Sequence, residues 1–83
     1  MTLLYFAWVR QKLGKGEETL VIPDNIGSVT ALVAYLCTLG PSYHEVFSDP
    51  SRLRAAVNQT HARFDTAITA DDEVAFFPPV TGG

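Results

Sequence analysis

The sequence has few of the groups that catalysis, metal binding or nucleic-acid binding requires. Its 83 residues include one cysteine and two histidines, and six lysines and arginines stand against nine aspartates and glutamates, for a net charge of −3. The single cysteine, Cys37, cannot form an internal disulfide, and two histidines without a cysteine cluster do not make a zinc site. Phosphate binding requires a basic face, whereas the cations here are scattered along the chain. We therefore expect no bound metal and no nucleic-acid partner.

Long apolar segments and targeting signals are also missing. No apolar run reaches the roughly 18 residues that span a bilayer, and the N-terminal segment lacks the basic region and cleavage site of a secretory signal. We expect a cytoplasmic protein that makes no membrane contact. Hydrophobic residues make up 47% of the chain and the mean hydropathy is +0.13, which is too apolar for a disordered chain. A chain of this length forms one domain with one small core, so a self-contained enzyme pocket is not expected.

The N-terminal half shows the patterns of two strands and a helix. Residues 2–9 are almost continuously apolar, which predicts a central strand buried on both faces. Glycines at 14 and 16 predict a turn into a second strand over residues 17–22. Apolar residues at 29, 32, 33 and 36 have helical spacing, with Ser28 as N-cap and Gly40–Pro41 as the end of the helix.

The C-terminal half predicts mainly strands. Residues 43–53 suggest a short helical turn and a loop, and strands are predicted over residues 53–58, 62–64 and 74–77, with a turn at Asn58–Gln59. The complete order predicts an α+β domain in which a single helix covers one sheet face. The two terminal strands are apolar enough to lie together in the middle of the sheet.

The last ten residues, VAFFPPVTGG, carry no charged side chain, although the ends of small domains are usually polar. Pro78 and Pro79 end the strand and stiffen the exit. Two glycines without a Cβ would let the terminal carboxylate pass down a narrow channel and approach a nucleotide closely. Since a carboxylate is unreactive towards nucleophiles until it is activated, we interpret the tail itself as the candidate site. The alternative is an inert glycine end.

Several segments resemble one known family, the small subunits of molybdopterin synthase. They are residues 55–60 (AAVNQT), Phe64–Asp65 and the ending DEVAFFPPVTGG, together with YFAWVR at 5–10 and Gly14. The resemblance covers nearly the whole chain and departs from the family at Asp71, where glycine is common. It implies a ubiquitin-like β-grasp fold, with a mixed sheet and one main helix packed on one face. The domain would span residues 1–77, and a flexible tail over residues 78–83 would end in Gly-Gly.

The resemblance implies a sulfur carrier in molybdenum cofactor biosynthesis. A ubiquitin-activating-like adenylyltransferase would use ATP and Mg²⁺ to adenylate the carboxylate of Gly83, and a sulfur donor would convert the adenylate into a thiocarboxylate. In a heterotetramer with the large subunit of molybdopterin synthase, this sulfur would attack cyclic pyranopterin monophosphate to form the dithiolene. The chain would bind no cofactor itself. It would be the sulfur-donating subunit of a sulfurtransferase and would not be catalytic on its own.

The implied site lies at the C-terminus. Gly83 would carry the sulfur, and Thr81 and Gly82 would occupy the channel. The partner-binding residues would be Phe76, Phe77, Pro78, Pro79 and Val80. Cys37, at the edge of the apolar helix stripe, is interpreted as a packed residue and not as a nucleophile. Three alternatives stay open: a ubiquitin-like modifier that forms isopeptide bonds, a sulfur carrier of another pathway such as thiamine synthesis, and an adaptor with an inert tail.

Overall fold

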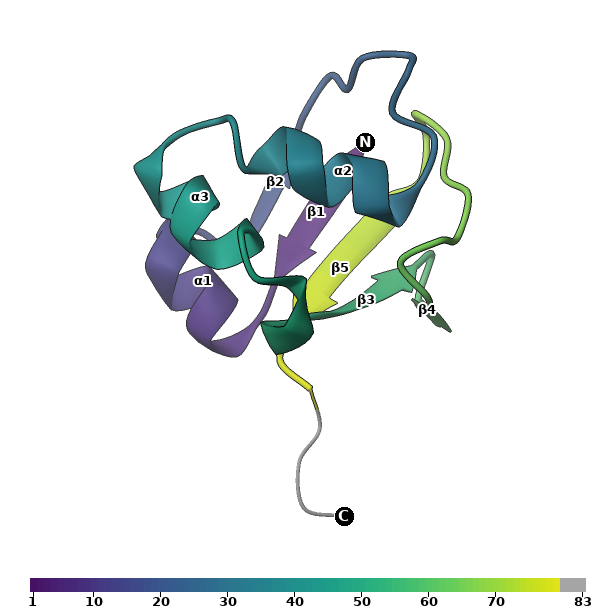
Figure 1. The fold of residues 1–83 in the computed structure, drawn as a ribbon. Coiled ribbons are helices and arrows are strands. Elements are labelled where there is room, and N and C mark those ends of the chain that lie inside the picture. Colours follow the sequence, from purple (N-terminus) through teal and green to yellow (C-terminus); the bar gives the residue numbers. More distant parts are fainter. Residues whose placement is uncertain (80–83) are drawn as a thin grey trace.

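A five-stranded mixed sheet, in the order β2-β1-β5-β3-β4, carries three helices (Figure 1). The computed structural model describes residues 1–79, and residues 80–83 lie outside the described part of the chain. The elements in chain order are β1 (Thr2–Tyr5), α1 (Ala7–Leu13), β2 (Glu17–Thr19), α2 (Val29–Leu36), α3 (Pro41–Phe47), the 3₁₀ turn η1 (Pro50–Arg52), β3 (Arg54–Val57), β4 (Thr60–Ala62) and β5 (Glu73–Phe77).

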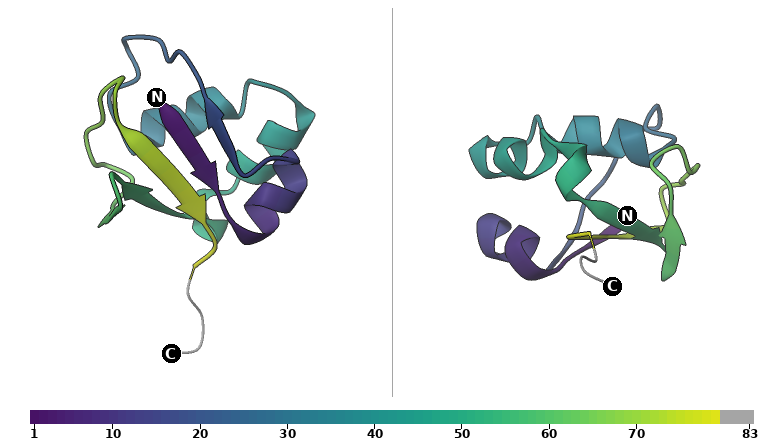
Figure 2. Two further views of the ribbon diagram at one scale, coloured as in Figure 1. Left: turned by 180° about the vertical axis from the view of Figure 1, so that it is seen from behind. Right: turned by 60° about the horizontal axis from the view of Figure 1, so that its bottom comes forward.

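The first and last strands are neighbours in the middle of the sheet, as the sequence predicts. β5 runs parallel to β1 and antiparallel to β3, while the outer strands β2 and β4 pair antiparallel to their neighbours. Helices α2 and α3 lie over one face, and α1 sits at the end of β1 against α3. Seen from behind, the opposite face of the sheet has no helix over it (Figure 2). The sheet therefore has a covered face and an open face.

The core lies between the covered face and the helices. Leu3 and Tyr5 on β1 and Val74 and Phe76 on β5 are at most 1% exposed, whereas the residues between them are partly exposed. This alternation is the period of two expected for a sheet with one buried face. The expectation that the first strand is buried on both faces is therefore wrong, because none of the described residues forms a layer over the open face.

The segment that follows β1 is a helix and not the continuation of a strand. The chain turns at Ala7, whose φ is 53°, and α1 then runs to Leu13, where Gly14 ends it with a left-handed φ of 76°. Val9 is the one fully buried side chain of this helix. The apolar residues that predicted a strand here instead supply a short helix with a narrow buried face. The second strand is also shorter than predicted and ends at Thr19.

The middle helix forms where its spacing predicts, but a further helix follows it. Ser28 caps α2 by accepting a hydrogen bond from the backbone N–H of Ala31 at 3.1 Å. The helix ends at Leu36, before the predicted stop, and Gly40 and Pro41 begin α3. Proline is favoured in the first turn of a helix, because its missing N–H would have no partner there. Residues 1–79 thus contain three α-helices. Of these, α3, together with η1, overlaps the short helical turn predicted within residues 43–53, whereas α1 is not predicted.

The C-terminal strands are close to their predicted positions. β3 and β5 form as expected, and β4 comes earlier, at Thr60–Ala62 in place of residues 62–64. The predicted turn at Asn58–Gln59 is present, with both residues at positive φ (50° and 69°). Asn58 also donates from its side-chain nitrogen to Asp72 and accepts from the backbone N–H of Glu73, each at 3.0 Å. These bonds fasten the turn to the start of β5.

Candidate functional site

β5 ends at the edge of the domain, where Pro78 and Pro79 follow it. The strand is held on both sides, by β1 and by β3, and it ends at Phe77. Pro78 and Pro79 follow it outside any regular element and leave at the end of the sheet (Figure 1). Proline has no N–H for a sheet bond, which explains why the strand stops here. The predicted sulfur-carrying and channel residues, Gly83, Gly82 and Thr81, lie outside the described residues, as does Val80.

The two aromatic residues at the end of β5 face opposite sides of the sheet. Phe76 is 0% exposed and packs edge-on against Phe47 of α3, with the ring centroids 5.0 Å apart. Phe77 is partly exposed on the open face, where its ring lies 5.4 Å from the ring of His61. The assignment of Phe76 to the partner surface is therefore corrected, because its side chain belongs to the core. Phe77 is the aromatic residue that a partner can reach.

Phe77 belongs to an apolar area on the open face. Leu4, Ala75 and Ala56 lie side by side across β1, β5 and β3. Phe6, which follows β1, is 49% exposed, and its backbone N–H donates to the carbonyl of Phe76 at 3.1 Å. We call this area the docking patch, and it comprises Leu4, Phe6, Ala56, Ala75 and Phe77. The sequence pattern does not single out Phe6, because residues 2–9 are predicted as one strand buried on both faces. In the structure, its place one residue after Tyr5 puts it on the open side of the sheet.

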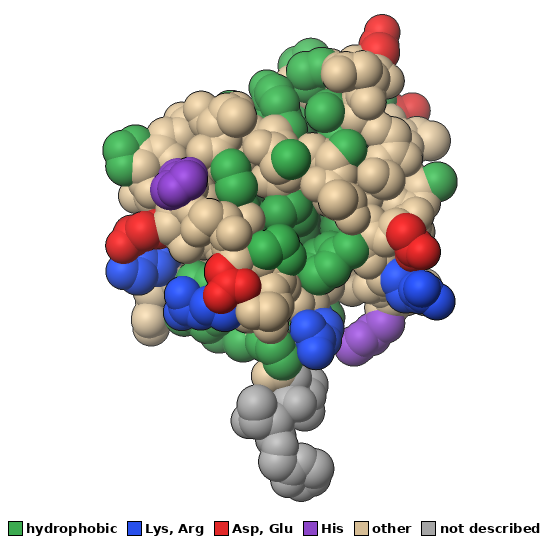
Figure 3. All heavy atoms as spheres, viewed as in Figure 1, with side chains coloured by type: hydrophobic (Ala, Val, Ile, Leu, Met, Phe, Trp, Pro, Cys, Tyr) green, Lys and Arg blue, Asp and Glu red, His purple; other side chains and the backbone are tan. Residues whose placement is uncertain are grey.

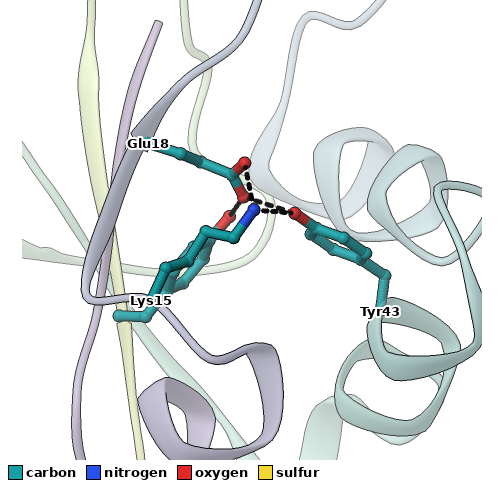
Figure 4. A network of polar contacts seen from close by, with 4 residues as sticks. Lys15, Glu18 and Tyr43 are labelled. Atoms are coloured by element: carbon teal, nitrogen blue, oxygen red, sulfur yellow. Dashed lines mark hydrogen bonds and ion pairs between the residues drawn. The ribbon is translucent and has the colours of Figure 1, made fainter.

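A group of polar side chains on the covered side has a structural role. The carboxylate of Glu18 on β2 accepts hydrogen bonds from the hydroxyls of Tyr5 (2.6 Å) and Tyr43 (2.7 Å) and from the ammonium of Lys15 (3.2 Å) (Figure 4). Burial raises the pKa of Glu18, but the three donors together lower it by more than burial raises it, so that the pKa lies below its ordinary value. Burial and the neighbouring Glu18 raise the pKa of Tyr5. The carboxylate thus stays ionised and ties β1, β2 and α3 together.

Cys37 has the surroundings of a packed residue. It is partly buried just after α2, and burial raises the pKa of its thiol, which lowers the fraction of reactive thiolate. The side chain lines an apolar hollow of about 300 Å³ with Val33, Phe47 and Phe64. Apolar side chains are visible in the middle of this face in Figure 3. These observations agree with the packing interpretation.

The described residues contain neither a cluster of metal ligands nor a membrane-spanning helix. Within residues 1–79, no group of three or more histidine, cysteine, aspartate or glutamate side chains is placed to hold a metal ion. No helix in that range is both long and apolar enough to cross a membrane. Trp8, whose contacts the sequence did not indicate, lies under the guanidinium of Arg52 at 4.3 Å.

The comparisons with known proteins agree with this geometry. The sequence pattern of the ThiS family matches residues 3–83. The chain belongs to the ThiS family. This ThiS-family chain is 43% identical over 81 residues to the molybdopterin synthase sulfur carrier subunit of Escherichia coli K12, covering 98% of this chain and 96% of that protein. The protein of the same name from Haemophilus influenzae Rd is 31% identical over 83 residues, covering 100% and 99% of the two chains.

A solved structure of similar fold is SAMP1 from Haloferax volcanii. Its TM-score is 0.75 at 26% identity, and the match covers 100% of this chain and 98% of that one. The ubiquitin-like β-grasp fold implied by the sequence is therefore confirmed for this ThiS-family chain, with α1 as a helix that the sequence did not predict.

Proposed function

We propose that this ThiS-family chain is the sulfur carrier subunit of a molybdopterin synthase and that its reactive group is the terminal carboxylate of Gly83. The observation that carries the proposal is the 43% identity, across 98% of the chain, to a subunit of that name. The position of β5 in the middle of the sheet supports it, because a strand held on both sides gives the tail a rigid base. No side chain of the folded domain is needed as a nucleophile.

The proposed chemistry has two stages before transfer. A carboxylate oxygen of Gly83 attacks the α-phosphorus of ATP on an adenylyltransferase, and pyrophosphate leaves with its charge balanced by Mg²⁺ on that enzyme. A sulfide-equivalent donor then attacks the acyl carbon, and AMP leaves as the carbon–oxygen bond breaks. The product is a thiocarboxylate on Gly83, whose sulfur is a far better nucleophile than the carboxylate oxygen. ATP and Mg²⁺ are used by the activating enzyme and are not cofactors of this chain.

Transfer takes place on the large subunit. The thiocarboxylate sulfur forms a bond to a side-chain carbon of cyclic pyranopterin monophosphate as the carbon–oxygen bond at that carbon breaks and the oxygen group leaves. Water then hydrolyses the thioester between the carrier and the pterin, which leaves the sulfur on the pterin and restores the Gly83 carboxylate. Two such transfers supply the two dithiolene sulfurs. Acid–base groups and the pterin pocket belong to the large subunit, and this chain delivers the nucleophile. The assembly is a heterotetramer, with one carrier at each end of a dimer of large subunits.

The docking patch is the surface through which the carrier meets the large subunit. It lies on the face that the helices of residues 1–79 leave uncovered, and its aromatic residue Phe77 immediately precedes Pro78, the first residue of the tail. Exposed apolar groups next to one another are costly in water unless a partner covers them. Docking here would place the base of the tail at the edge of the interface.

The test is the intact mass of the chain after incubation with an adenylyltransferase, ATP and a sulfide source. The proposal predicts replacement of one oxygen by sulfur, located at Gly83 by fragmentation. The matched control is Asp71→Ala, an exposed residue at the far end of β5, which should acquire sulfur like the wild type. A stable covalent adduct to lysines of other proteins, with no thiocarboxylate, would assign the chain to the modifiers and overturn the proposal.

A further inference from the structure

The strand directions gather cations that are scattered in the sequence. β1 and β5 are parallel, so α1, which follows β1, lies at the end of the sheet where β5 ends. β3 is antiparallel to β5 and therefore begins at this end, and β4 finishes there. Every lysine and arginine of the chain lies in α1, β3 or β4 or within two residues of one of them: Arg10, Lys12, Lys15, Arg52, Arg54 and Arg63. Figure 3 shows blue side chains along this lower edge of the molecule.

Half of these charges are paired within the domain. Lys12 pairs with Glu45 at 3.5 Å, Lys15 with Glu18 at 3.2 Å and Arg63 with Asp65 at 3.4 Å. Arg52 and Arg54 form no ion pair with any of residues 1–79. The carboxylate closest to them in sequence, Asp49, instead accepts two bonds from Ser51, at 2.6 and 3.2 Å. Both side chains are exposed, and although the guanidinium of Arg54 donates one hydrogen bond to the carbonyl of Leu53 at 2.9 Å, neither arginine is neutralised by a carboxylate of residues 1–79.

Arg54 lies beside the docking patch, and Arg52 lies at the same end of the sheet. Arg54 is directly opposite Phe77 in the register of β3 and β5, so both side chains stand on the same face of the sheet. Arg52 comes two residues earlier in η1 and stacks on Trp8 at 4.3 Å, which holds its guanidinium at this end. We call Arg52 and Arg54 the arginine pair. An exposed aromatic with unpaired cations beside it has the composition of a protein interface, in which aromatic residues and arginine are enriched.

We infer that the docking partner presents aspartate or glutamate side chains to the arginine pair, next to an apolar socket for Phe77. The inference rests on the proposed function, since it describes the surface of the large subunit that receives the carrier. The planar fork of a guanidinium matches a carboxylate, and opposite charges at the edge of an interface speed association and fix its orientation. A phosphate-bearing partner fits less well, because the chain has a net charge of −3 and the apolar side chain of Phe77 lies next to Arg54.

The test compares association rates of the carrier with purified large subunit at about 0.1 M and about 1 M salt, between which the Debye length falls from about 10 Å to about 3 Å. Arg54→Glu should lower the association rate about tenfold at the lower salt and much less at the higher salt. Arg54→Gln should have a smaller effect in the same direction. The matched control is Lys12→Gln, which removes a cation already paired with Glu45 and should associate like the wild type. Thermal unfolding confirms that each variant is folded.

Equal association rates for folded Arg54→Glu and the wild type at both salt concentrations would overturn the inference. Binding of inorganic triphosphate to the isolated chain, lost in Arg54→Glu, would assign the pair to phosphate and also overturn it. The mass of the activated chain separates this inference from the proposed function, because sulfur on Gly83 is acquired without the large subunit. A chain that acquires sulfur but docks without salt dependence contradicts the inferred contact between the arginine pair and carboxylates of the partner, and leaves the proposed function standing.

Discussion

Replacing Phe77 by alanine should weaken docking while leaving the domain folded. The side chain is partly exposed on the open face and touches His61, so its removal leaves no cavity in the core. A central aromatic anchor contributes about 2 kcal/mol to binding, and its loss raises the dissociation constant by about thirtyfold. The cost in folding stability should be about 1 kcal/mol or less, because little buried area is lost.

The neighbouring substitution Phe76→Ala is the matched control with the opposite outcome. Phe76 is 0% exposed and packs on Phe47 at 5.0 Å. Removing a buried phenylalanine costs about 3–5 kcal/mol. A domain of this size has a total stability of about 5 kcal/mol, so this variant should keep only about 0–2 kcal/mol and unfold in little or no urea.

Two measurements separate the variants. Urea unfolding gives the free energy of unfolding of each chain, and calorimetric titration with the large subunit gives the dissociation constant. The reasoning predicts a folded Phe77→Ala chain that binds weakly and an unstable Phe76→Ala chain. If Phe77→Ala bound the large subunit with wild-type affinity, or if Phe76→Ala were as stable as the wild type, the assignment of the two faces would be refuted.

Two further predictions concern the interior. Cys37→Ala should lower the free energy of unfolding by about 1 kcal/mol, because a small apolar group is removed, and should leave thiocarboxylate formation and transfer intact; loss of transfer in the folded variant would make the thiol a reactant. Glu18→Gln should cost about 1–2 kcal/mol through weakened charged hydrogen bonds from Tyr5 and Tyr43. Since the pKa of Glu18 is below its ordinary 4.5 in the folded chain, its stabilisation is present above about pH 4.5 and is lost as the pH falls through the folded-state value. Urea unfolding should be measured from about pH 3 to about pH 7. The free energy of unfolding should fall less on acidification in Glu18→Gln than in the wild type, and the same fall in both chains would contradict the role of this carboxylate.

The sequence predicts elements whose signals are local. The helical spacing of Val29, Leu32, Val33 and Leu36, with the cap at Ser28, is enough to define α2, and all four side chains are buried. The turn at Asn58–Gln59 and the last strand are likewise set by their own residues. The sequence predicts a strand where α1 forms, because aromatic and β-branched residues fit a strand. The helix forms because the chain turns at Ala7, and this turn has no signal in the local sequence.

The site was predictable in position but not in orientation. Alternation along a strand places Phe76 and Phe77 on opposite faces, yet the sequence does not say which face the helices cover. The arginine pair was hidden for a similar reason, since Arg52 and Arg54 meet Phe77 only through the antiparallel pairing of β3 with β5. Pairing between strands that are far apart in the sequence cannot be predicted from the local residue pattern.

The central claim is that the Gly83 carboxylate carries the sulfur, and the most direct test is to change the end of the chain and measure sulfur transfer. Deleting Gly83 withdraws the carboxylate by roughly 3.5 Å, and a displacement near 1 Å can cost about a hundredfold in rate. Adding one residue after Gly83 converts the same carboxylate into an amide. The account predicts that both chains keep the fold and bind the large subunit, but form no thiocarboxylate with activating enzyme, ATP and sulfide, and convert no pterin precursor. A chain lacking Gly83, verified by mass, that still acquired sulfur and supported conversion at near wild-type rate would contradict it.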